Sequence, residues 1–310
     1  GQFYVAKNPT YGAVFTYHLK DVPKTSKSKR IQSERKLNSD KKDIPFPGYK
    51  ALSDEMNEKP ASIILTIKDS NGNLINNVKK NASNGSGRIA WNLRHKSYYP
   101  IRSGSFRGGW GWSPSGPYAT PGDYQAELFL ENNGSIEKLD GPINFSVKPL
   151  REGTLKGASY DEYNRFRERV SELYINISKY EDVFSMIGNK IQLLEKASMQ
   201  LESFSPDIIA KISDFKDRYN DYEYENDSSP ARDEIGEWYK PNLGARIRIA
   251  MQGLSTSYGP TELNSSNLEI AEKHFEKMKN EIEQLNKEVK DLENEVKQLN
   301  PPYIIGQGID

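Results

Sequence analysis

The 310-residue chain contains no cysteine, which excludes disulfide bonds, thiol catalysis and zinc sites built on thiolates. Histidine is almost as scarce: only His18, His95 and His274 occur, and no pair has the spacing of a metal-binding helix. The sequence also lacks the Gly-x-Ser-x-Gly turn of serine hydrolases and the phosphate loop that ends in Gly-Lys. We therefore expect that the chain is not an enzyme and has no catalytic residue, metal or cofactor.

Long apolar runs and an excess of one charge are missing too. No stretch approaches the roughly 18 to 20 apolar residues of a membrane span, and no signal peptide is recognisable. Lys plus Arg and Asp plus Glu both number 43, so the net charge is zero. Because phosphates attract a positive surface, this balance predicts no nucleic-acid partner. The basic run from Lys24 to Lys42 is typical of a solvated helix or linker.

The strongest pattern present is an apolar seam whose members alternate at spacings of three and four residues. The seam consists of Leu268, Ala271, Phe275, Met278, Ile282, Leu285, Val289, Leu292, Val296 and Leu299. Such spacing predicts one long helix with a single buried face. Ser266 and Glu269 have the form of a capping box at its start, and Pro301 and Pro302 predict its end.

A second seam of the same spacing extends from Tyr163 to Leu201, with Ser159 and Glu162 as its capping box. Two matched seams predict the long helices of one antiparallel bundle, and a coiled coil with another chain is the alternative. Shorter helices are expected after Ser205 and over Leu243–Leu254. Residues 151–310 are thus predicted to form a helical bundle with two long and two short helices.

Residues 1–150 have the pattern of an antiparallel β-domain. Apolar residues alternate or cluster in short runs separated by turn residues, at 12–19, 62–68, 74–75, 88–94, 123–130 and 142–147. A polar stretch at 21–59, with one short helix expected over Ser28–Leu37, interrupts the series. About seven short strands with frequent turns predict an Ig-like β-sandwich. The predicted fold class is therefore α+β multidomain: an Ig-like antiparallel sandwich followed by the bundle.

One loop stands out as a candidate binding site, because it combines aromatic rings with glycines. Its candidate residues are Tyr98, Tyr99, Phe106, Arg107, Trp110, Trp112 and Tyr118. Flat rings on a pliable backbone suit stacking on sugar rings, a separate protein partner, or packing within the chain. The turn Asp69–Asn73 has some oxygen ligands of a calcium loop, but no closing Glu, and a hairpin turn is the favoured interpretation.

Several segments resemble the region after the last blade in bacterial sortilin-like β-propeller proteins with neuraminidase-type repeats, which are classed with glycosyl hydrolases. These segments are Phe3-Tyr4, Asn8-Pro9, Tyr11–Ala13, Phe15–Lys20, Ile67–Asp69 with Gly72, Trp91–Arg94 and Ala119–Tyr124. The resemblance covers most of the chain. The propeller blades have no counterpart here, so we expect a fragment of a longer protein.

The resemblance implies an exported bacterial protein, of the Bacteroidetes, at the cell surface, in the periplasm or outside the cell. Its Ig-like and helical domains would dock on their own propeller or on a protein partner. No catalytic residue of a sialidase or glycosidase corresponds to a position of this chain, so none is transferred. A carbohydrate-binding accessory module that uses residues 98–118 is the alternative function.

Overall fold

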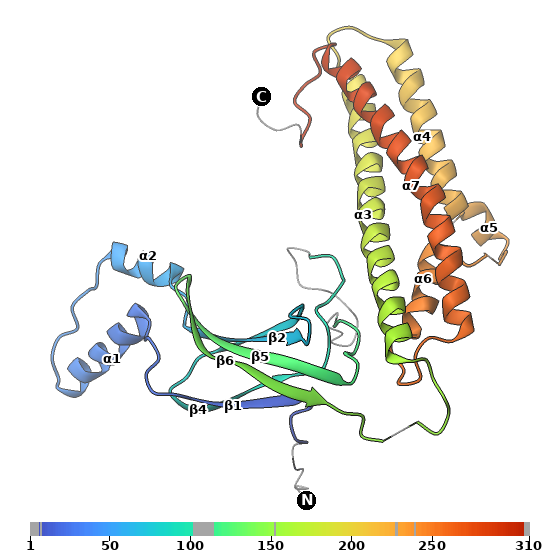
Figure 1. Ribbon diagram of the computed structural model, residues 1–310. Coiled ribbons are helices and arrows are strands. Elements are labelled where there is room, and N and C mark those ends of the chain that lie inside the picture. The colour runs from blue at the N-terminus through green and yellow to red at the C-terminus, as the bar shows by residue number, and fades with distance from the viewer. Residues whose placement is uncertain are drawn as a thin grey trace, which may run out of the picture. The chain divides into compact units, whose positions relative to one another are not determined.

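The computed structural model describes residues 6, 8–101, 115–151, 153–226, 229–238 and 240–306. Within them the chain is an α+β protein with two antiparallel sheets and seven helices (Figure 1). It divides into two compact units, which are described separately. The first comprises the described residues up to 97 and those of 115–151, and the second comprises 98–101 and those from 153 onward. No helix of the described chain has the length and apolarity needed to cross a membrane.

The sheets of the first unit are a four-stranded and a two-stranded one. The larger has the order β3-β2-β5-β6, formed by β2 (Ser62–Asp69), β3 (Leu74–Asn81), β5 (Gly122–Asn132) and β6 (Ser135–Val147). In the smaller, β1 (Ala13–Leu19) pairs with β4 (Gly85–Trp91). The described residues thus hold six strands rather than about seven. β6 begins at Ser135 instead of Pro142, because its first half is too polar to show an apolar alternation.

The two sheets of the first unit enclose one hydrophobic core. Alternate residues of β2 point into it, and Ile63, Leu65 and Ile67 are at most 1% exposed. The fully buried Trp91 of β4 contacts Tyr124 of β5, with ring centroids 5.1 Å apart. Alternation of apolar and polar residues therefore decides which face of each strand is buried.

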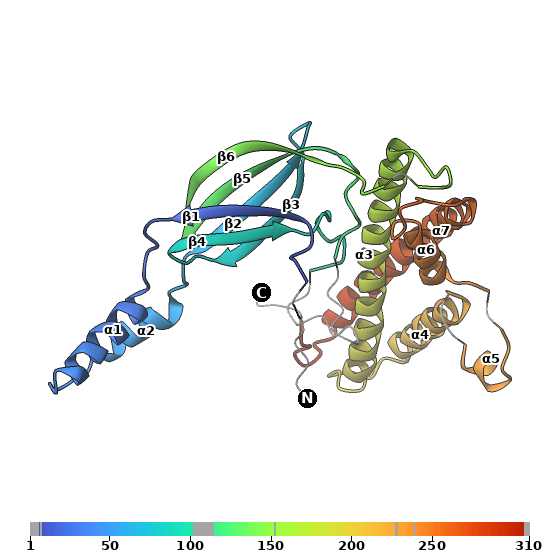
Figure 2. The ribbon, with the colours of Figure 1, turned by 90° about the horizontal axis from the view of Figure 1, so that it is seen from below.

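The polar insertion forms two helices, α1 (Ser26–Ser39) and α2 (Tyr49–Asn57), where the sequence predicted one. Neither helix contains a buried residue. Both lie beyond the ends of the strands of their unit, as Figures 1 and 2 show. The second helix escaped prediction because nine residues are too short for its apolar repeat of Tyr49, Leu52 and Met56 to stand out from a loop.

The second unit is organised around two long helices, α3 (Tyr160–Ser198) and α7 (Glu262–Lys297). Their seams lie in one shared core, and Val170 of α3 and Val289 of α7 are 0% exposed. Burial of both seams within a single chain is therefore confirmed. The capping box of Ser159 and Glu162 is confirmed as well.

Shorter helices complete this core. α4 (Pro206–Asn226) packs on the later part of α3, where Phe184 and Tyr219 stack at 4.2 Å. α6 (Leu243–Gln252) packs at the start of α7, where Arg246 Nη1 donates to Asn267 Oδ1 at 2.9 Å. α5 (Pro230–Glu234) lies between them, where no helix was expected, so the described residues hold three short helices instead of two.

The predicted start of α7 is wrong. The capping box is formed by Thr261 and Asn264, not by Ser266 and Glu269, so the helix begins about one turn earlier. Asn264 is only 7% exposed, and its Nδ2 donates to Ile249 O of α6 at 2.7 Å. Because the buried groups of this first turn are amides, apolar periodicity could not reveal it.

Candidate functional site

The aromatic loop 98–118 is only partly covered by the structure. Phe106, Arg107, Trp110 and Trp112 lie outside the described residues. Tyr98 and Tyr99 belong to the second unit, and Tyr118 belongs to the first.

Tyr98 and Tyr99 pack against the long helix α3. Their rings stack on each other at 5.2 Å, and both meet Tyr174 edge-on, at 5.4 Å and 5.1 Å. Burial raises the pKa of the Tyr99 phenol, because the phenolate would lose its hydration. These two rings form a small cluster with a helix residue rather than an open stacking platform.

Tyr118 is held at the other end of the loop by the segment that follows β4. The guanidinium of Arg94 lies 3.7 Å from the centre of its ring, and Arg94 Nη1 donates to Gly116 O at 3.0 Å. A Cβ on Gly116 would be 2.3 Å from His95 O, so only glycine fits between the two segments. Tyr118 thus contributes to a cation–π contact that closes the loop.

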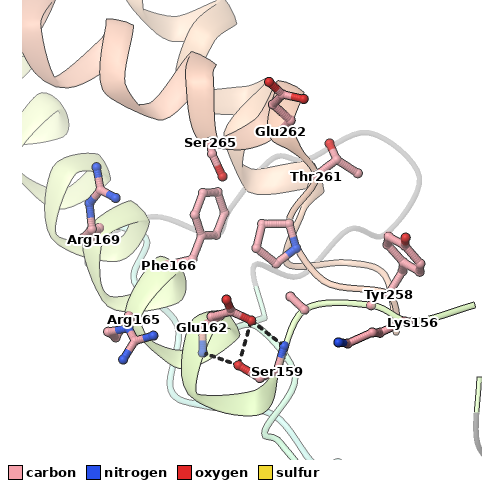
Figure 3. Close-up of a pocket in the computed structure, with 13 residues that line it drawn as sticks. Lys156, Ser159, Glu162, Arg165, Phe166, Arg169, Tyr258, Thr261, Glu262 and Ser265 are labelled. Carbon is pink, nitrogen blue, oxygen red and sulfur yellow. Dashed lines mark hydrogen bonds between the residues drawn. The ribbon is translucent and has the colours of Figure 1, made fainter.

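Figure 3 shows a different feature, an open hollow of about 1120 Å³ where α3 and α7 begin. It is lined by Lys156, Gly157, Ala158, Ser159, Glu162, Arg165, Phe166, Arg169, Tyr258, Pro260, Thr261, Glu262 and Ser265. The ring of Phe166, only 5% exposed, forms part of the lining (Figure 3). The sequence did not reveal this hollow, because α7 was expected to begin after the residues that line its second side.

The polar groups of the hollow mainly serve the two helix starts. Glu162 Oε2 accepts from Ser159 N at 2.8 Å and from Ser159 Oγ at 2.7 Å (dashed in Figure 3). These hydrogen bonds, the one from the Ser159 side chain first, hold the pKa of Glu162 below its usual value. On the α7 side, Thr261 N donates to Asn264 Oδ1 at 2.9 Å. At each helix start, two backbone N–H groups, those of Ser159 and Glu162 and those of Thr261 and Asn264, therefore already have side-chain partners.

Two cations of the hollow differ in their surroundings. Arg169 makes a two-pronged ion pair with Glu272 of α7, at 3.1 Å and 2.8 Å, which raises the pKa of the guanidinium. Arg165 makes no ion pair within 4 Å with any described residue. The exposed guanidinium of Arg165 is therefore available to a carboxylate that enters the hollow.

The remaining sequence candidates also have structural roles. Asp69 Oδ1 accepts from Asn71 N and Asn73 N at 2.9 Å and 2.8 Å, as expected for a hairpin turn. His274 Nε2 of α7 lies 3.1 Å from Asn226 Oδ1 at the end of α4. No cluster of three or more His, Asp or Glu suited to a metal ion occurs in the part of the chain that the structure covers.

Comparison of the chain with known protein families, with proteins of curated function and with solved structures finds no match.

Proposed function

We propose that the chain is a non-catalytic structural and interaction module. In this proposal the first unit is an Ig-like β-sandwich, and the second is an antiparallel helical bundle. Both belong to the C-terminal part of an exported bacterial β-propeller protein and dock on the propeller or on a protein partner. The link to propeller proteins rests on the resemblance of the segments quoted above.

One observation carries the proposal: the described aromatic residues of loop 98–118 are used in packing. Tyr98 and Tyr99 pack on Tyr174, and Tyr118 packs under Arg94. A sugar platform needs ring faces left open to the ligand, whereas these rings contact other side chains of the chain. In this proposal, regions other than loop 98–118 bind the partner. The hollow beside Arg165 could bind an acidic group of that partner.

A glycan array separates this function from carbohydrate binding. We expect that neither the wild-type chain nor the Trp110→Ala/Trp112→Ala variant binds any glycan. Binding by the wild type that the double variant loses would overturn the proposal in favour of sugar recognition. The pair Tyr98→Ala/Tyr99→Ala gives the structural control, since loss of its packing on Tyr174 lowers the melting temperature.

A hydrolase assay tests the absence of catalysis. We expect turnover of aryl glycosides and sialosides to stay at background for the chain alone. Turnover above background that is abolished by replacing one carboxylate would instead indicate an active site with paired acids.

A further inference from the structure

The insertion that forms α1 and α2 is an unusually basic part of a neutral chain. Residues 24–59 contain ten Lys and Arg against six Asp and Glu, a net charge of +4, while the whole chain has a net charge of zero. Eight of these cations make no ion pair within 4 Å with any residue that the structure describes. They are Lys24, Lys27, Lys29, Arg35, Lys36, Lys41, Lys42 and Lys59.

The hairpin of α1 and α2 is nevertheless an ordered element. Arg30 joins the two helices, because its Nε and Nη2 donate to the two carboxylate oxygens of Glu55, each at 2.8 Å. At the base, Ser26 N donates to Glu58 Oε2 at 2.6 Å. Val22 N then donates to Asn84 Oδ1 at 2.7 Å, which ties the hairpin to the turn before β4. A two-pronged Arg–carboxylate pair fixes the relative orientation of its partners.

The far end of this hairpin carries large apolar side chains instead of burying them. Ile44, Phe46 and Tyr49 are 49%, 63% and 84% exposed, and the rings of Phe46 and Tyr49 meet edge-on at 5.1 Å. Lys41 and Lys42 precede them in the connection between the helices, with Asp43 between Lys42 and Ile44. The connection lies at the end of the hairpin away from the strands (Figures 1 and 2). We name residues 41–49 the hairpin tip.

We propose that the hairpin tip binds an anionic lipid surface, with Ile44, Phe46 and Tyr49 entering the interface and the lysines contacting lipid phosphates and carboxylates. Basic residues next to exposed aromatic and aliphatic groups are the combination that interfacial anchors use. The tip lies away from the strands of its unit (Figures 1 and 2), and its apolar groups are not among the residues that line the hollow at the starts of α3 and α7, so it suits a deformable flat surface better than an acidic peptide that needs a groove. This inference uses residues independent of the proposed docking function.

Sedimentation of the full chain with vesicles tests the proposal. We expect binding to vesicles of phosphatidylcholine mixed with phosphatidylserine, weakening with added salt, and little binding to phosphatidylcholine alone. At about 1 kcal/mol per basic residue, Lys41→Glu/Lys42→Glu should reduce partitioning by at least about 20-fold. The control Lys287→Glu/Lys290→Glu changes the net charge equally, on exposed positions of α7, and should leave most of the binding intact.

A second pair of variants tests the apolar contribution. Phe46→Ser/Tyr49→Ser should lose most of the binding, whereas Met199→Ser/Phe204→Ser, which alters equally exposed side chains outside the hairpin, should retain it. Because the chain has no cysteine, Pro45→Cys provides a single site for an environment-sensitive fluorophore. Its emission should shift to the blue with anionic vesicles, and a label at Ser33→Cys on α1 should shift less.

Four results would overturn the proposal. They are no binding to anionic vesicles at low salt, equal binding to neutral vesicles, equal losses in the test and control pairs, or an unshifted label at position 45. Tighter binding to a single-stranded oligonucleotide than to the vesicles would assign the same basic and aromatic groups to nucleic acid instead.

Discussion

At the scale of single residues, Gly188 shows how a neighbouring side chain decides which residue a position can hold. Gly188 lies within α3, where a Cβ would be 2.6 Å from the hydroxyl and 2.7 Å from Cζ of Tyr219. The ring of Tyr219 cannot retreat freely, because it stacks on Phe184. Glycine is therefore needed for close approach of the two helices, although it is a weak helix former.

Gly188→Ala is expected to destabilise the protein by about 1–3 kcal/mol, the usual cost of overpacking. Gly244→Ala is the matched control, because α6 leaves 3.7 Å between its Cβ and the nearest atom. There the gain in helix propensity should stabilise by about 0.5–1 kcal/mol. Denaturant titration measures both changes, and equal signs for the two variants would contradict the packing argument.

Glu162 makes stability depend on pH. Its pKa is lowered in the folded chain, chiefly by the hydrogen bond from the Ser159 side chain, so the cap stabilises above the carboxyl's unfolded pKa. The contribution is lost as the pH falls through the lower folded pKa. We expect the difference in melting temperature between wild type and Ser159→Ala to be large at neutral pH and to shrink in acid. A difference independent of pH would show that charge plays no part in the cap.

At the scale of elements, the buried seam of α7 is the strongest determinant of the second unit. Leu285 is 5% exposed, and most other seam residues of α7 are exposed even less. Leu285→Asp removes its packing and places an unpaired carboxylate in the core, which should cost about 4 kcal/mol or more. Asn280→Asp, at an exposed position of the same helix, should change stability by no more than about 0.5 kcal/mol. Thermal unfolding followed by circular dichroism would compare them, and similar melting temperatures would mean that the seam is not buried.

At the scale of the whole molecule, two hydrophobic cores with no residue in common suggest two unfolding events. We expect calorimetry to resolve two transitions. Leu285→Asp should lower one of them, and Leu65→Ala, at a 1% exposed position of β2, should lower the other. A single transition that both variants lower together would show that the units unfold as one.

The success of prediction differs between elements for physical reasons. Ser62–Asp69 and Tyr160–Ser198 were anticipated within a few residues, because their apolar side chains repeat with the period of the element itself. The start of α7 and the first half of β6 were missed, because polar residues occupy most of their positions. A capped first turn of a helix and the pairing of two strands can both form without an apolar repeat. α2 was missed for another reason: its apolar repeat spans only nine residues.

The sequence by itself determined which faces of the helices and strands are apolar. Those faces must be buried against other elements, because the period of the apolar residues matches the period of the helix or strand. It also determined the absence of thiol chemistry, since no cysteine exists. Only the tertiary structure decided that Tyr98 and Tyr99 pack on Tyr174, and that Ile44, Phe46 and Tyr49 remain exposed. These outcomes depend on contacts between residues distant in the chain, or on the lack of such contacts, and no local pattern of residues encodes them.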